Sequence, residues 1–516
     1  MPFQASLLPT ISQNKEKNMK ILILGAGLSG LSAAIAFSHS PSHPHQILVL
    51  EARPTPSPTK GGINVRPAAT RILNTWGLHS QLARIGEPTT SFINRNLYSG
   101  KVANRTILVE ATGSVDWGTT RDELVKVLLE RARGLGVRVR FGVGVEGVWE
   151  EGEKAFVRLS NGEVEEGDMV LAADGIRSRV RPQILSDVVE RGCSVDPIVS
   201  DITLYGVRIE GHGDMPPLFV EDSEYVVTWI GKDAFCISRY NRTLGHARGL
   251  FGIRGQTDQK GLWDEQGDIE FVRRAFRNAC PDLRAMLGKA TSCDRWRLAE
   301  LPDLERWTSR GGRIVLLGDS AHGMEPNAAH GFSVSVEDVG VLEYVVNRFD
   351  GQEVAARIPE ITRQWERIRK PRVERIKAWA KENTAVFVGE PPKDRILRES
   401  GEGRRISLKN VKPRMEGHFD SREFLKWTLD YDAVEEVSEK SMLTIRTYLA
   451  DTVFAGQEDR RKAAEGQPLN TAVDREACEG GCERTIQSIL DRVDTYIELL
   501  TASKTFAPFS EQRCWA

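Results

Sequence analysis

Short apolar runs mark the strands that this chain is expected to bury on both faces. The first run, at residues 19–24, leads directly into the turn Gly25-Ala26-Gly27-Leu28-Ser29-Gly30 and then into a helical segment. A second run, at residues 47–50, ends at Glu51. Strands covered on both faces are typical of parallel sheets flanked by helices. The pattern therefore predicts a strand–turn–helix–strand unit at the start of an α/β domain.

Other segments alternate between apolar and polar residues, as strands with one covered face do. Residues 137–141 and 225–230 are examples, and such strands are concentrated between residues 185 and 300. An apolar strand at 313–317 then returns the chain to the α/β core, and the pattern is mainly helical from Ser333 onward. We therefore expect a mixed sheet inserted into a parallel sheet with helices on both faces.

The composition is that of an ordinary globular protein. Of 516 residues, 40% are hydrophobic and 28% are charged, and 70 Lys+Arg against 72 Asp+Glu leave a formal charge of -2. This balance offers no positive field for nucleic acid, and no apolar run reaches the ~20 residues that cross a bilayer. Seven Cys form an odd and sparse set, which argues against a disulfide framework. We expect a cytoplasmic protein with no nucleic-acid partner and no membrane span.

Gly25, Gly27 and Gly30 form a G-x-G-x-x-G pattern between a strand and a helix. The first glycine permits a tight turn, the second lets the backbone approach a pyrophosphate, and the third lets the helix pack close to the strand. The helix N-terminus adds N–H groups and the positive end of its dipole. Glu51, which follows the second strand, can accept hydrogen bonds from a ribose diol. The pattern predicts an adenine dinucleotide site and leaves open whether the ligand is NAD or FAD.

Two further motifs follow this site in the order that a known family has them. Residues 174–181 (DGIRSRVR) resemble the DG motif of class A flavoprotein monooxygenases. Residues 318–322 (GDSAH), with Pro326 and Gly331 after them, resemble the GD motif of the same family. With the first pattern these are the three marks of the p-hydroxybenzoate and salicylate hydroxylase group. The similarity extends from about residue 19 to residue 432, and its late part is similar to fungal enzymes of secondary metabolism.

The resemblance implies a Rossmann-like α/β FAD-binding domain of the p-hydroxybenzoate hydroxylase type, with an inserted mixed β-sheet substrate domain and a helical C-terminal region. The expected parts, in chain order, are the first part of the FAD-binding domain with some of the substrate region near 76–118 (19–184), the mixed-sheet substrate domain (185–300), the second part of the FAD-binding domain with a long helix (301–389), a loop or linker (390–418) and a helical C-terminal tail (419–516). Cys478 and Cys482, in this tail, have no His or further Cys pair nearby, so no metal site is expected.

The resemblance also implies FAD as the cofactor and NAD(P)H as a transient reductant. Asp319 is expected to bind ribityl hydroxyls, while the helix after it directs its N-terminal dipole at the flavin. Asp174 is expected to link the dinucleotide with handling of the reductant, or else to brace its turn. The full set of expected cofactor-binding residues is Gly25, Gly27, Gly30, Glu51, Gly61, Gly62, Arg121, Asp174, Asp319, Pro326, Gly331 and Phe332.

Arg208 and Tyr225 are the expected catalytic residues, because they fall where fungal relatives that hydroxylate phenols place an Arg that binds phenolate and an assisting Tyr. Such an Arg raises the electron density of the ring; a sheet-face Arg and a packing Tyr are the plain alternative. For His322 and His330, beside the flavin loop, capping or packing is the first expectation and proton transfer the second. His330 and the bulky Phe332 also depart from the Gln and the small residue that relatives often have.

The resemblance predicts an FAD-dependent monooxygenase. In its reaction NAD(P)H reduces the FAD, O2 adds to flavin C4a, and the hydroperoxide inserts one oxygen atom into an aromatic or polycyclic small molecule. Hydroxylation is the leading reaction, and epoxidation or oxidative dearomatisation comes next. The alternatives are a flavin oxidase or dehydrogenase on the same scaffold and a catalytically silent flavin-binding protein.

Overall fold

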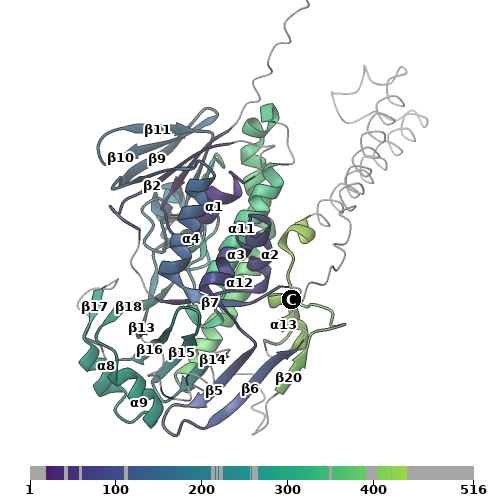
Figure 1. Ribbon diagram of the computed structural model, residues 1–516. Helices are drawn as coiled ribbons and strands as arrows, with labels where there is room; N and C mark the ends of the chain where they lie inside the picture. The colour runs from purple at the N-terminus through teal and green to yellow at the C-terminus, as the bar shows by residue number, and fades with distance from the viewer. Residues whose placement is uncertain are drawn as a thin grey trace, which may run out of the picture. The chain divides into compact units, whose positions relative to one another are not determined.

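A computed structural model gives the fold of the chain (Figure 1). It describes residues 19–39, 45–56, 61–109, 114–210, 216, 219, 225–255, 257–258, 265–347, 351–390, 404–419 and 421–437. These residues all belong to the unit Met1–Ser438, whereas the unit Glu439–Ala516, which holds Cys478 and Cys482, lies outside them. Among the described helices, none combines the length and the apolar composition that crossing a bilayer requires.

A five-stranded parallel sheet forms the α/β core, in the order β19-β12-β1-β2-β8. Its strands are β1 (Lys20–Leu24), β2 (Gln46–Glu51), β8 (Arg138–Phe141), β12 (Met169–Ala172) and β19 (Ile314–Leu316). Helices α1 (Leu28–Ala36), α4 (Arg121–Gly134) and α11 (Gly331–Val346) belong to the same core. The apolar side chains of β1 are fully buried, as the continuous apolar run predicts for a central strand. The predicted α/β fold is confirmed.

A second, mixed sheet has nine strands in the order β17-β18-β13-β16-β15-β14-β5-β6-β20. Its strands are β5 (Ser91–Asn96), β6 (Val102–Val109), β13 (Ile198–Glu210), β14 (Tyr225–Ile230), β15 (Ala234–Asn241), β16 (His246–Arg254), β17 (Glu265–Gly267), β18 (Cys293–Glu300) and β20 (Arg404–Ser407). Most neighbours are antiparallel, but β14 pairs with β5 and β20 pairs with β6 in parallel. Three separate stretches of chain therefore meet in one sheet, drawn below the core in Figure 1.

Strand β20 lies inside the stretch 390–418, for which the sequence predicts a loop or linker. It is four residues long and begins with Arg404 and Arg405. A short strand that opens with two arginines lacks the apolar alternation by which strands are recognised. Its pairing with Thr106–Val109 of β6, far away in the sequence, is what makes it a strand.

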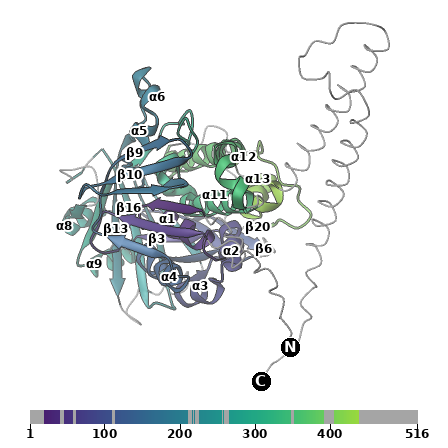
Figure 2. The ribbon, with the colours of Figure 1, turned by 90° about the horizontal axis from the view of Figure 1, so that it is seen from above.

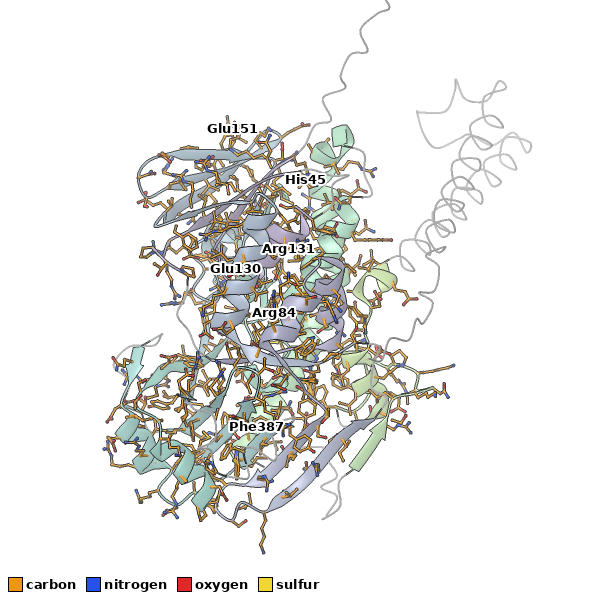
Figure 3. All side chains as sticks on the ribbon, viewed as in Figure 1. His45, Arg84, Glu130, Arg131, Glu151 and Phe387 are labelled. Atoms are coloured by element: carbon orange, nitrogen blue, oxygen red, sulfur yellow. The ribbon has the colours of Figure 1, made fainter. Side chains whose placement is uncertain are left out.

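The two faces of the nine-stranded sheet are covered differently. Helices α8 (Ile269–Ala275) and α9 (Pro281–Gly288) pack on one face, over a cluster that includes Trp229 and Phe251. On the other face Phe235 packs against Phe387, the last residue of the long helix α12 (Gly351–Phe387), with ring centroids 5.7 Å apart. Figure 3 labels Phe387 where α12 reaches this sheet. The end of α12 therefore joins the core to the sheet.

Two three-stranded sheets and several short helices complete the described part of the fold. The sheet orders are β11-β10-β9 and β3-β7-β4. The strands are β3 (Gly62–Val65), β4 (Glu87–Pro88), β7 (Trp117–Thr120), β9 (Val145–Glu151), β10 (Lys154–Leu159) and β11 (Val164–Gly167). The helices are α2 (Pro67–Thr75), α3 (His79–Ile85), α5 (Arg181–Ile184), α6 (Ser186–Glu190), α10 (Asp319–His322), the 3-10 helix η1 (Pro326–Ala328) and α13 (Arg422–Leu429). In Figure 2, α11, α12 and α13 are grouped on one side of the core.

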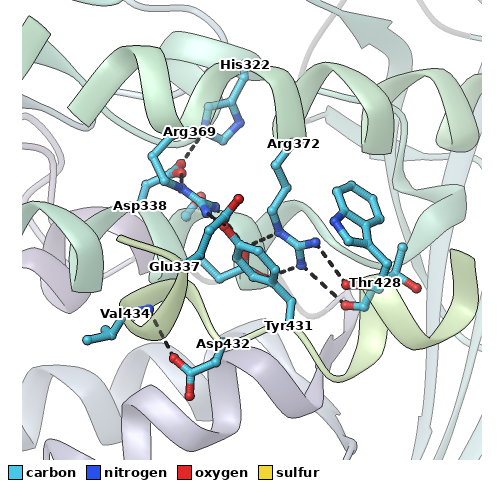
Figure 4. Close-up of polar contacts among 12 residues, drawn as sticks. His322, Glu337, Asp338, Arg369, Arg372, Thr428, Tyr431, Asp432 and Val434 are labelled. Atoms are coloured by element: carbon cyan, nitrogen blue, oxygen red, sulfur yellow. Dashed lines mark hydrogen bonds and ion pairs between the residues drawn. The ribbon is translucent and has the colours of Figure 1, made fainter. Parts of the chain in front are cut away.

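Buried ion pairs join α11, α12 and the segment after α13 (Figure 4). Glu337 and Asp338 of α11 are fully buried, and each pairs with the Arg369 guanidinium at 2.7 Å. Arg372 also pairs with Glu337 at 2.7 Å, and Arg369 donates to the Tyr431 hydroxyl at 3.0 Å. Burial alone raises the pKa of Glu337, but Arg372 and Arg369 lower it to about 2. These charges are compensated inside the protein, as buried charges must be.

Candidate active site

A cavity of about 2220 Å³ lies at the carboxyl ends of the core strands and continues along the nine-stranded sheet. The loops after β1, β2, β12 and β19 line its first part, and β5, β6, β13 to β16 and β18 line its second part. Ligands of α/β proteins bind at this edge of the parallel sheet. Pockets for a single small molecule typically measure ~300–1,000 Å³. The cavity therefore has room for a cofactor and a second molecule.

Each of the three glycines of the first motif serves a different structural purpose. Gly25 has a φ of +102°, and a Cβ there would lie 2.5 Å from the Ala173 carbonyl oxygen. A Cβ on Gly30 would lie 2.0 Å from the Gly25 carbonyl oxygen, so Gly30 serves the packing of α1 and does not line the cavity. A Cβ on Gly27, by contrast, would meet no atom within 4 Å. Because Gly27 lines the cavity, its missing side chain leaves space for a ligand beside the start of α1.

Glu51, at the end of β2, lines the cavity and holds the turn in place. Its Oε2 accepts a hydrogen bond from the backbone N–H of Ala26 at 2.8 Å, and its Oε1 accepts one from the N–H of Arg53 at 2.8 Å. Each carboxylate oxygen has a further lone pair. Glu51 can therefore brace the glycine turn and still accept hydrogen bonds from a ribose diol.

Asp174 follows β12, braces the turn after it and lines the cavity. Its Oδ2 accepts hydrogen bonds from the backbone N–H groups of Arg179 at 2.9 Å and Val180 at 3.4 Å. Its Oδ1 is buried and accepts no hydrogen bond from a described residue, and burial raises the pKa of this carboxyl. Arg181 ties the turn to α10 by donating to the Ser320 carbonyl oxygen at 3.1 Å. These contacts hold the turn in place.

The GD motif forms the opposite wall of the same region. Asp319 begins α10, directly after Gly318 turns the chain with a φ of +66°. Pro326 begins η1, and Gly331 and Phe332 begin α11; all of them line the cavity with Asp319. A Cβ on Gly331 would meet only a Met324 side-chain atom, at 4.0 Å, so internal packing does not require glycine there. The first-turn N–H groups and dipole of the 16-residue α11 suit a ligand with negative charge.

Gly61, Gly62 and Arg121 lie together where β3 pairs with β7. The Arg121 backbone N–H donates to the Gly61 carbonyl oxygen at 3.0 Å, and Gly62 is opposite Thr120 in the ladder. A Cβ on Gly61 would meet only the Arg121 side chain, at 3.9 Å, so this loop is open toward the cavity that all three residues line.

The residues present fit an FAD molecule. The space beside Gly27 suits a pyrophosphate. The carboxylates of Glu51 and Asp319 suit the ribose and ribityl hydroxyls. Of the twelve predicted cofactor-binding residues, eleven line the cavity and Gly30 supports the turn from behind. Direct contact of each residue with FAD stays a prediction.

Arg208 and Tyr225 do not line this cavity. The Arg208 guanidinium donates to Asp122 Oδ2 at 2.9 Å and pairs with Glu210 through Nε. The Tyr225 ring lies 4.4 Å from the guanidinium carbon of Arg105, which does line the cavity. Successive side chains of a strand point to opposite faces, so placing a residue on the sheet does not decide whether it reaches the cavity. Their predicted contact with a substrate has no support in this geometry.

The sequence motifs did not point to a buried set of charges beside the cavity. Arg66 pairs with Asp116 at 2.6 Å, and both side chains are almost fully buried. The Arg239 guanidinium donates to Thr89 Oγ1 at 2.5 Å, and burial lowers its pKa to about 10. A Cβ on Gly118 would lie 1.9 Å from Arg239 Nη1, so that glycine makes room for the arginine. Each residue is isolated in the sequence, and only the folding of distant segments brings them together.

The two histidines near this loop are held by internal contacts. His322 Nε2 lies 2.7 Å from Asp338 Oδ2 in the buried ion cluster. His330 Nδ1 donates to the Ala328 carbonyl oxygen at 2.6 Å, and burial lowers its pKa to about 3, which keeps the ring neutral. The His330 ring also packs edge-on against Trp379. These contacts agree with packing roles, the first expectation for both residues.

Comparison with known proteins extends the likeness beyond single motifs. Residues 18–346 match the family model described as FAD binding domain. The FAD-dependent monooxygenase OpS4 of Beauveria bassiana is 31% identical over 366 residues, which cover 69% of this chain and 83% of that protein. The 6-hydroxynicotinate 3-monooxygenase of Bordetella bronchiseptica is 25% identical over 381 residues, or 72% of this chain and 93% of that protein.

The fold agrees with a solved structure as well. The salicylate hydroxylase substrate complex matches with a TM-score of 0.61 at 18% identity, covering 74% of this chain and 92% of that one. The glycine cradle, the two motif loops that share its cavity, the matched domain and these relatives all lead to one conclusion. The chain carries this FAD-binding domain and belongs to the FAD-dependent monooxygenases.

Proposed function

We propose that this chain uses NAD(P)H and O2 to insert one oxygen atom into an aromatic or polycyclic small molecule, with hydroxylation of an electron-rich ring as the leading reaction. The observation that carries the proposal is the continuity of the cavity from the glycine turn to the nine-stranded sheet. A relative acts on 6-hydroxynicotinate, a hydroxylated aromatic ring. Epoxidation and oxidative dearomatisation use the same arrangement and differ only in the product.

The second part of the cavity has the composition of a site for a ring-shaped molecule. Ile237 and Leu250 line it from the sheet, and Leu425 and Leu429 line it from α13. Arg105 and Arg239 add positive charge at its polar end. An apolar wall with a few convergent polar groups is typical of small-molecule sites.

In this proposal the first part of the cavity would hold FAD, and the second part would hold the substrate. Bound FAD supplies the redox chemistry, because it accepts hydride from NAD(P)H and activates O2. The chain's own residues would bind the pyrophosphate beside Gly27 and hold hydroxyls with Glu51 and Asp319, and the positive end of the α11 dipole would stabilise negative charge on the cofactor. The apolar wall excludes water from the reacting groups. Tyr225 influences a substrate only indirectly, through its contact with Arg105, whose guanidinium lies over the Tyr225 ring.

Anaerobic reduction followed by labelled oxygen tests the proposed function. The purified chain is loaded with FAD and mixed with NADPH without O2, and the flavin absorbance is recorded with and without 4-hydroxybenzoate, 1-naphthol, 7-hydroxycoumarin or 6-hydroxyindole. We expect bleaching that at least one of these compounds accelerates, and one atom of label in its product under ¹⁸O2. A flavin that NADPH never bleaches, or a product without label, would instead indicate an oxidase or dehydrogenase.

A further inference from the structure

A cluster of apolar side chains forms one end of the cavity, where the long helix α12 meets the nine-stranded sheet. Its accessible members line the cavity and are only partly buried: Ile237 of β15, Leu250 of β16, Trp296 of β18 and Phe387 of α12. Behind them lies a fully buried layer that includes Phe235. Covering exposed apolar surface with an apolar ligand group is favourable, so this end of the cavity suits a hydrocarbon group.

The strand register places the three sheet residues of this cluster on one face. Ile237 is directly opposite Leu250 in the β15–β16 ladder, and Gly206 of β13 is opposite Leu250 on the other side of β16. Residues directly opposite each other share a face of the sheet. A Cβ on Gly206 would lie 3.4 Å from the Trp296 ring, so this ring lies over the glycine. Ile237, Leu250 and Trp296 therefore form a continuous apolar floor.

The same row of side chains becomes polar beyond the apolar floor. Thr228 of β14 is opposite Ile237. Asn94 of β5 follows opposite Thr228, and Asn104 of β6 follows opposite Asn94. All three polar residues line the cavity. A molecule that matches this row therefore has one apolar end and one polar end.

The apolar floor adjoins the cofactor end of the cavity. A Cβ on Gly62, one of the expected cofactor-binding residues, would lie 3.9 Å from the Arg248 side chain. Leu250 is on the same face of β16 as Arg248, because alternate residues of a strand share a face. A ring bound beside Gly62 can therefore extend a substituent over the apolar floor.

Phe387 adds a wall to this end of the cavity from outside the matched domain, which ends at residue 346. Its ring packs against Phe235, which holds it beside the sheet, and it belongs to the same apolar cluster as the floor. The shared FAD-binding domain therefore does not by itself determine the size of this end of the cavity.

We propose that the apolar floor and Phe387 form a specificity subsite, which binds a hydrocarbon substituent on the ring to be oxygenated. This inference rests on the proposed function and names its substrate class: aromatic compounds that carry an alkyl or alkenyl side chain. Burial of each CH2 group of that chain strengthens binding roughly 4-fold, the equivalent of ~0.8 kcal/mol.

A series of 4-alkylphenols with unbranched chains from methyl to hexyl tests the subsite. Binding to the FAD-loaded protein is measured by calorimetry without NADPH, and kcat/KM for NADPH oxidation is measured in parallel. For wild type we expect the affinity to rise roughly 4-fold with each CH2 group until the subsite is full. We expect kcat/KM to rise in the same order.

Ile237→Phe and Phe387→Leu change the subsite in opposite directions. Ile237→Phe adds bulk, so it should bind 4-pentylphenol at least ~10-fold more weakly than wild type does. Its unchanged affinity for 4-methylphenol would show that the variant is folded. Phe387→Leu removes bulk, so the gain should continue to a longer chain. Ile198→Phe and Phe271→Leu are the matched controls, because these residues of β13 and α8 do not line the cavity, and both should follow wild type.

The two measurements separate failure of the subsite from failure of the proposed function. If the alkylphenols accelerate NADPH oxidation but their affinity for wild type does not rise with chain length, the subsite is overturned and the proposed function stands. An identical rise in wild type and every variant would show binding to any apolar surface and would also overturn the subsite. A rise that Ile237→Phe and Phe387→Leu alter, without faster NADPH oxidation, supports the subsite and counts against the proposed function.

Discussion

The guanidinium carbon of Arg372 lies 3.5 Å from the centroid of the Tyr431 ring. This contact joins α12 to the segment after α13, and the Leu425 and Leu429 side chains of α13 line the cavity. A cation over an aromatic ring that is shielded from water contributes on the order of 1–2 kcal/mol. The contact therefore helps to hold one wall of the cavity in place.

Removing the Tyr431 ring should loosen that wall. We expect Tyr431→Ala to lower the free energy of unfolding by about 3 kcal/mol, because the ring, the cation contact and the hydrogen bond from Arg369 are lost together. Tyr431→Phe keeps the ring and should cost about 1 kcal/mol. Urea unfolding of the three proteins measures both values. Equal midpoints for wild type and Tyr431→Ala would show that the Tyr431 side chain contributes no stability.

Because Gly27 and Gly30 serve different structural purposes, we expect their alanine variants to have different defects. Gly27→Ala places its Cβ in open space, so the apoprotein should unfold at the wild-type temperature while FAD binds at least ~10-fold more weakly, a loss of about 1.4 kcal/mol. Gly30→Ala drives its Cβ to 2.0 Å from a backbone oxygen, so the apoprotein itself should lose ~1–3 kcal/mol of stability or more. Thermal unfolding without FAD and a fluorescence titration with FAD separate the two effects. The idea is wrong if both variants fail in the same assay.

The buried pair of Arg66 and Asp116 should be sensitive to the loss of one partner. Asp116→Asn leaves a guanidinium that is 3% exposed without a neutralising charge, and breaking a buried pair in this way costs ~3–5 kcal/mol. The double variant Arg66→Met/Asp116→Asn removes the stranded charge and should recover part of this loss. A double-mutant cycle by chemical denaturation gives the coupling energy. Additive effects of the two changes would mean that the pair has no energetic role.

Glu343 predicts a pH effect on stability that is the reverse of the usual one for a carboxyl. Burial raises its pKa from 4.5 to about 7, so the native protein holds a proton that the unfolded chain releases between these values. Stability from this group is complete below pH 4.5 and is lost as the pH rises through about 7. Glu343→Gln should therefore exceed wild type in stability at pH 8 by on the order of 2 kcal/mol.

The comparison for Glu343→Gln is made at two pH values by urea unfolding. At pH 4 the advantage over wild type should vanish, because the wild-type carboxyl is then protonated in both states. An advantage of equal size at both pH values would point to altered packing and not to ionisation.

The cofactor end of the site could be predicted from the sequence because its signals are local. Gly25, Gly27 and Gly30 are close together in the chain, and the reason for each can be read from the strand and helix that flank them. The buried apolar runs of β1 and β2 likewise determine a parallel core before any contact is known. Each of these features depends only on a short segment of the sequence.

The substrate end could not be predicted in the same way, because it is made of contacts between distant segments. Arg208 lies on the sheet as expected, but its guanidinium meets Asp122, more than eighty residues earlier in the chain, and does not reach the cavity. Arg66, Arg239 and Gly118 likewise carry no sequence signal, because only the packing of distant segments brings them together. Such properties belong to the packed fold and not to a motif.

The parallel pairing of β20 with β6 has a practical consequence for shortened forms of the chain. A version that ends with α12, at Phe387, retains every residue of the three cofactor motifs but loses the partner of β6. The backbone N–H and C=O groups along that side of the nine-stranded sheet would then be open to pairing with another molecule, which is a common route to aggregation. A shortened form should therefore extend beyond Ser407, the end of β20, so that the sheet keeps its own last strand.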